Sequence, residues 1–81
     1  FPAFKIIQLK AKIIGFRELE GESVIRAWER LKSYMRACPQ HGFRDQEIFQ
    51  IFYQGLSERN RQRLNAAGPG IFVDLTVEEA K

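Results

Sequence analysis

The sequence predicts an all-α domain, a small bundle of four to five short helices. Apolar residues recur at spacings of three and four through most of the chain. Residues that favour helix N-termini stand before these runs, and Gly or Pro follows several of them. No set of alternating segments indicates a convincing β-sheet.

The composition limits the size and class of the domain. The chain has 81 residues, of which 44% are hydrophobic and 28% charged, too apolar for a disordered protein. A domain this small buries only about 60% of the surface that its unfolded chain exposes, so self-association would stabilise it. The formal net charge of +3 is too small to indicate a dedicated nucleic-acid-binding protein.

The cysteine content and the hydropathy bear on localisation. The single cysteine, Cys38, cannot form an internal disulfide, which favours a reducing compartment, and we expect a cytoplasmic protein. No apolar run approaches the ~18 residues of a membrane span, and we expect no membrane partner. Because the chain begins with Phe1, we expect it to be a piece of a longer protein.

The first segment, residues 4–16, fits two interpretations. A set that alternates as in a strand is Ile7, Leu9, Ala11 and Ile13. A set with helical spacing is Ile7, Ala11 and Ile14. Periodicity alone leaves both open.

The clearest helix follows Gly21, which allows a turn. Glu22 and Ser23 stand at its entry, where an acceptor and a negative charge satisfy free backbone amides and oppose the helix dipole. Pro39 ends the helix by disfavouring the helical conformation at the preceding residue. One face carries an apolar stripe of five residues: Val24, Trp28, Leu31, Met35 and Cys38. We assign the first four of these to the core.

A third helix is expected from Asp45, as its cap, to Gly55, which would end it in the left-handed conformation before Leu56. Its apolar residues cover too much of the circumference for a single core contact. Ile48 and Phe52 are assigned to the core. Phe49 and Tyr53, one turn apart, are a candidate oligomer interface, with core burial as the alternative.

A fourth helix is expected from its cap, Ser57, to about Ala67, with Leu64 as its core anchor. After the helix-breaking residues 68–70, the pattern Thr76-Val77-Glu78-Glu79 predicts the start of a fifth helix, cut off at the chain end. The fourth helix also carries weak candidates for nucleic-acid contact, whose spacing of two spreads them around the helix: Arg59, Arg61 and Arg63.

The sequence lacks a recognisable catalytic or metal site. His41 is the only histidine, and its Cys-x-x-His spacing with Cys38 supplies only two of the four ligands of a structural zinc. Two chains could supply two each. The alternative is that Cys38 packs as a small apolar residue and His41 hydrogen-bonds the backbone. We expect no catalytic residue, metal, cofactor or small-molecule substrate.

Several stretches resemble Gag, the capsid precursor of retroelements. The stretch from Leu19 to Leu31 resembles the major homology region of retroviral capsids, where a polar turn enters an amphipathic helix through a glutamate and ends at an arginine. Glu22 and Arg30 stand at those two places. Three further stretches are similar to Gag of gypsy-class long-terminal-repeat retrotransposons, notably plant ones: residues 28–32, 38–42 and 52–56. The resemblance covers roughly residues 16 to 80.

The resemblance implies a capsid C-terminal-type assembly domain over residues 16–81 and the end of a preceding helix, or a linker, over residues 1–15. For the ambiguous first segment, the resemblance favours a helix over a strand. It implies a polar network of Glu18, Glu22 and Arg30 that joins the turn to the domain; solvated surface charges are the alternative. Glu18 replaces the usual glutamine, and a glutamate cannot donate a hydrogen bond unless protonated.

The function implied by the resemblance is homotypic capsid assembly, without catalysis, in a retroelement or in a host gene derived from one. The expected partner is a second copy of the chain, with RNA bound weakly through the full-length protein. A helical nucleic-acid-binding module, permitted by the pI of about 9.4, is one alternative. A dimerising adaptor of the SCAN type is another.

Overall fold

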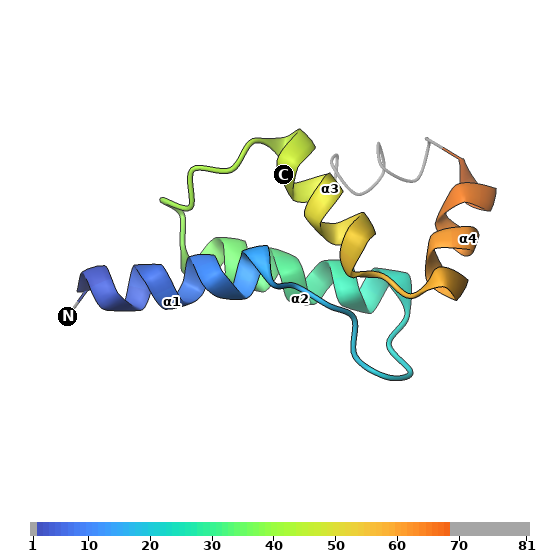
Figure 1. Cartoon of the computed structure of the whole chain (residues 1–81), viewed down its shortest axis with the longest axis horizontal. Helices are drawn as coiled ribbons and strands as arrows, with labels where there is room; N and C mark the ends of the chain where they lie inside the picture. Colours follow the sequence, from blue (N-terminus) through green and yellow to red (C-terminus); the bar gives the residue numbers. More distant parts are fainter. Residues whose placement is uncertain (1, 69–81) are drawn as a thin grey trace.

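The computed structural model describes residues 2–68, and these form four helices joined by short turns (Figure 1). The helices are α1 (Pro2–Ile14), α2 (Val24–Ala37), α3 (Asp45–Gly55) and α4 (Glu58–Ala67). No strand occurs within residues 2–68, and the all-α prediction is confirmed. The fifth helix expected from Thr76 lies outside the described residues.

Helix α1 settles the ambiguity of the first segment in favour of a helix. It lies antiparallel to α2 and side by side with it (Figure 1). Its Ile13 is fully buried, and Phe16 in the following turn is also buried, so the two sides of the expected boundary at residue 15 share one core. The stripe with helical spacing, by contrast, faces outward, because Ile7 and Ile14 are exposed.

Helix α2 has the bounds that its local sequence predicts. The Ser23 hydroxyl accepts a hydrogen bond from the Arg26 amide at 3.2 Å, as an N-cap does. At the other end, Cys38 leaves the helical conformation before Pro39. Between these ends, Trp28 and Leu31 are buried.

The core is centred on Trp28. Its ring stacks on Phe49, with centroids 5.6 Å apart, and meets the edge of Phe52 at 5.1 Å. Half-buried side chains packed against this core include Val24 and Met35. The buried apolar cluster consists of Ile13, Phe16, Ala27, Trp28, Leu31, Ile48, Phe52, Leu56 and Leu64.

The predicted start of α3 is wrong by one residue. Arg44, and not Asp45, is the N-cap residue. The reason is that Glu47, in the first turn, reaches back and accepts the Arg44 amide at 2.9 Å. This is the backward half of a capping box, so the cap does not need a side-chain acceptor at position 45.

The predicted role of Gly55 is also wrong. Gly55 remains helical, and the glycines with positive φ among the described residues are Gly21, Gly42 and Gly68. Its carbonyl instead accepts the Glu18 amide at 2.8 Å. A Cβ atom at this position would collide with the backbone oxygen of Phe16. Glycine is therefore required here for close backbone approach.

Helix α4 begins at the predicted cap, since the Ser57 hydroxyl accepts the Asn60 amide at 3.3 Å. It ends before Gly68, whose φ is 79°. Leu64 is its buried apolar residue. Among residues 2–68, no helix has the length and apolar character needed to cross a bilayer.

The contact between Gly55 and Phe16 generates a stability prediction. Gly55→Ala should lower the free energy of unfolding by about 1 to 3 kcal/mol, because backbone atoms must shift to admit the methyl group. Gly15→Ala is the matched control, since its Cβ meets only the Ala11 carbonyl, at 3.2 Å. Urea unfolding of both variants measures the difference. Equal losses in the two variants would contradict the proposed role of Gly55.

Candidate functional site

The candidate site is a polar network around Arg30, in the middle of α2. The helix directs this side chain toward the turn between α1 and α2, over the face of Phe16, whose ring centroid is 4.5 Å from the guanidinium carbon. Such a cation–π contact lets a planar charged group rest on the core without losing all its solvation. Arg30 is thereby placed where its polar atoms meet the turn.

Arg30 binds Glu22 through two parallel hydrogen bonds. Its Nε donates to Glu22 Oε2 at 2.9 Å, and its Nη2 donates to Oε1 at 3.0 Å. Nη2 also donates to the Arg17 carbonyl, and Nη1 to the Tyr34 hydroxyl at 3.1 Å. The two charged side chains are 22% and 10% exposed, so this pair is largely removed from water. Two-point geometry of this kind is strong and directional.

Glu22 extends the network into the turn. Its Oε1 accepts the Leu19 amide at 2.9 Å, which fixes the backbone of the turn on the carboxylate. The hydrogen bonds from Arg30 lower the pKa of Glu22, aided by the Leu19 amide and opposed by burial. The same bonds raise the pKa of Arg30. Both groups are therefore held in their charged forms.

Glu18 joins the turn to α4 and makes no hydrogen bond with Arg30. Its Oε1 accepts the Ser57 amide at 2.7 Å and Asn60 Nδ2 at 3.0 Å. Burial works against ionisation of Glu18, yet these hydrogen bonds bring its pKa below the ordinary value. Its charge also lies at the N-terminus of α4, where the helix dipole favours an anion. The glutamate thus acts purely as an acceptor.

Asn60 completes the network, and our sequence reasoning missed it. The side chain is buried, and its Nδ2 also donates to the Glu22 carbonyl at 3.1 Å. One amide group therefore links Glu18 to the backbone beside the Arg30–Glu22 pair. The available signal was its place one turn before Leu64, on the side of α4 that faces the core.

Phe49 and Tyr53, the candidate oligomer interface, lie on the side of α3 that packs against the core. Both residues are half-buried and pack against the core. Phe49 stacks on Trp28, and the Tyr53 hydroxyl hydrogen-bonds Asn65. Phe49 is thus partly covered by α2, and Tyr53 contacts α4.

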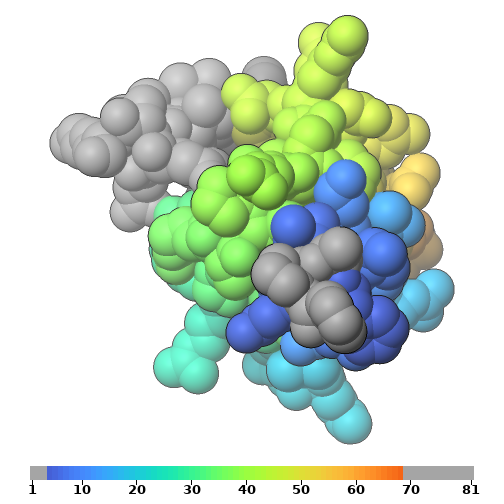
Figure 2. Space-filling view, turned by 90° about the vertical axis from the view of Figure 1, so that its left-hand side faces the viewer, coloured from blue at the N-terminus to red at the C-terminus, as the bar shows by residue number. Residues whose placement is uncertain are grey.

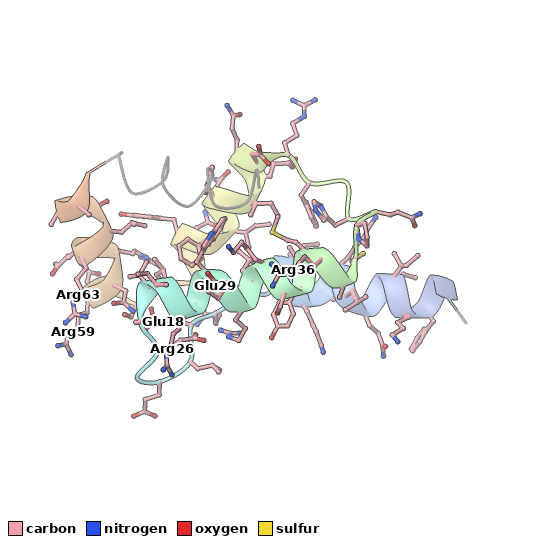
Figure 3. The ribbon with its side chains drawn as sticks, turned by 180° about the vertical axis from the view of Figure 1, so that it is seen from behind. Glu18, Arg26, Glu29, Arg36, Arg59 and Arg63 are labelled. Carbon is pink, nitrogen blue, oxygen red and sulfur yellow. The ribbon has the colours of Figure 1, made fainter. Side chains whose placement is uncertain are left out.

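The three arginines of α4 do not form one patch. Arg61 donates to the carbonyls of Tyr53 at 3.1 Å and Gln54 at 3.0 Å, which closes the C-terminal end of α3. Arg59 and Arg63 are exposed, and they lie next to one another at the α4 end of the molecule (Figure 3). Of the three arginines of α4, these two remain available for an anionic partner.

The side chains of Cys38 and His41 have different partners. Cys38 is buried, and its carbonyl accepts the His41 amide at 3.1 Å. The Nδ1 of His41 accepts the Phe43 amide at 2.9 Å, and the two rings stack. Within residues 2–68, no group of three or more His, Cys, Asp and Glu residues is placed to hold a metal ion.

The polar network links three segments of the chain, and its geometry suits a structural role. The carboxylates of Glu18 and Glu22 each accept several hydrogen bonds from protein groups. Groups satisfied in this way hold the turn, α2 and α4 in fixed relation. Their interactions are internal to the domain, so loss of one partner leaves the others buried and unpaired.

The Arg30–Glu22 pair generates a double-mutant prediction. Arg30→Ala and Glu22→Ala should each lower the free energy of unfolding by about 1 to 3 kcal/mol, because each leaves a largely buried partner unpaired. The double variant should lose less than the sum. Arg36→Ala, at an exposed position in the last turn of the same helix, is the control. Additive losses of a few tenths in urea unfolding would indicate solvated charges instead.

The lowered pKa values of Glu18 and Glu22 predict acid sensitivity. A carboxyl whose pKa is lower in the folded state stabilises that state above its unfolded pKa, and this stabilisation is lost as the pH falls through the folded value. The free energy of unfolding should therefore decrease as the pH drops below the ordinary value of 4.5. Glu22→Gln should flatten part of that decrease. Urea unfolding from neutral to acidic pH measures both slopes, and parallel curves would contradict the assignment.

No family model, no curated protein and no solved structure matches this chain.

Proposed function

We propose that this chain is the assembly domain of a Gag-like capsid protein, and that it works through contacts between its own copies. The observation that carries the proposal is the two-point bond between Arg30 and Glu22. These residues stand at the arginine and glutamate positions of the homology-region pattern. Glu18, four residues earlier, stands at the third polar position and bonds the start of α4.

The physical connection between this network and assembly is rigidity. The domain has one small buried cluster, and domains of this size gain little stability from the core alone. A polar network that fixes the turn against α2 and α4 allows the outer faces to present constant surfaces. A surface that is already ordered loses less entropy when a partner binds.

The outer surface supports a role in protein contact. Among the described residues, five large hydrophobic side chains are more than half exposed, and the first three of them lie on α1: Phe4, Ile7, Ile14, Leu19 and Ile25. Apolar residues that gather on one face mark interaction surfaces more often than isolated ones do. Nucleic-acid binding gains less support, because Arg61 is engaged with α3 and leaves two exposed arginines on α4.

Self-association tests the proposed function. Sedimentation velocity of the purified chain over micromolar to millimolar concentrations should show reversible dimers or larger assemblies. The reason is that association would bury the exposed apolar side chains, and interfaces of modest area have dissociation constants in this range. A parallel series with single-stranded RNA separates assembly from nucleic-acid binding. A chain that stays monomeric at about 1 mM, with or without RNA, would contradict the proposal.

A further inference from the structure

Helix α1 carries an apolar stripe that the rest of the described chain leaves uncovered. The stripe consists of Phe4, Ile7, Ala11 and Ile14, at spacings of three, four and three. These spacings place all four on one face of the helix. The three large side chains are 61%, 64% and 62% exposed, in chain order, whereas Ile13 on another side of the helix is fully buried.

The position of α1 makes this stripe accessible to a partner. The first turns of α1 extend past the end of α2 (Figure 1). In Figure 2, which looks onto this end of the molecule, α1 lies at the surface beside the end of α2. A partner can therefore approach along the length of the helix.

We propose that a second copy of this chain covers the stripe, with two α1 helices packed antiparallel; this rests on the proposed self-association. The spacing of three, four and three reads the same in both directions, so the stripe is complementary to its own antiparallel copy. Phe4 of one copy meets Ile14 of the other, and Ile7 meets Ala11. The small Ala11 side chain provides the space that Ile7 needs.

The lysines of α1 define the electrostatics of this contact. Its charged residues are Lys5, Lys10 and Lys12, and none of them forms an ion pair with another of residues 2–68. At 100° per residue, Lys5 and Lys12 lie roughly 120° or more around the helix from the middle of the stripe. Lys12 is also placed over the Tyr34 ring, 5.8 Å from its centroid.

Lys10 borders the stripe and gives the contact a distinctive salt dependence. In the antiparallel pair, the Lys10 side chains of the two copies lie on the same side of the contact, near its centre. Their repulsion is screened by salt, so the dimer should become tighter as salt is added. An anionic partner, whether RNA or a lipid surface, would bind more weakly under the same change.

The size of the contact sets the expected affinity. Helix α1 has 13 residues and is therefore about 20 Å long. Two such helices bury less than the ~1,200 Å² of a standard interface, so dissociation constants in the high micromolar to millimolar range are expected. That range suits a contact that becomes stable only when repeated in an assembly.

The experiment is sedimentation equilibrium of the whole chain at low and high salt, with three variants whose helicity is checked by circular dichroism. Ile7→Gln removes a large part of the stripe, and Ala11→Gln fills the space for Ile7 without removing a large apolar side chain. Ile25→Gln is the matched control, because Ile25 is 60% exposed on α2, outside the stripe. Both α1 variants should weaken the dimer at least about tenfold, the control should not, and wild-type association should strengthen with salt.

Each other outcome overturns the proposal in a different way. Wild-type dimers that the α1 variants do not weaken would place the contact elsewhere and leave the proposed function standing. A wild-type chain that is monomeric under all conditions would overturn both. Association that weakens with salt would exclude the paired α1 helices. Binding to phosphatidylserine vesicles that Ile7→Gln abolishes, without any dimer, would assign the stripe to an anionic lipid surface.

Discussion

The guanidinium of Arg30 connects parts of the chain that apolar packing alone does not position. The turn between α1 and α2 has few buried side chains besides Phe16, and its shape depends on hydrogen bonds. Arg30 supplies bonds to the Arg17 carbonyl and to Glu22, and Glu22 in turn binds the Leu19 amide. One side chain of α2 thereby organises the backbone of the turn on both sides of Glu18.

A charged pair at this position costs desolvation free energy, and the structure reduces that cost in two ways. The pair keeps partial exposure, and the remaining polar atoms of Arg30 and Glu22 have protein partners such as Tyr34 and Leu19. A pair satisfied in this manner contributes more to the geometry of the domain than to its net stability. Asn60 connects α4 to the same network through its hydrogen bonds to Glu18 and to the Glu22 carbonyl.

The aromatic residues of α3 pack against the core of this small domain. Trp28 stacks on Phe49 and makes an edge contact with Phe52, so both phenylalanines of α3 pack within the domain. The large exposed apolar residues instead gather on α1, at Phe4, Ile7 and Ile14. The self-association proposed above would use α1, which, like α4, contributes one side chain to the buried apolar cluster.

The sequence by itself determined the features that depend on neighbouring residues. The starts of α2 and α4 follow from Ser23 and Ser57 as N-caps, because capping acts within one turn. Only the tertiary structure decided which face of α1 is buried and why position 55 is glycine, since both depend on Phe16 and on segments distant in the chain. The partners of Asn60 lie 38 and 42 residues away, beyond the reach of any local pattern.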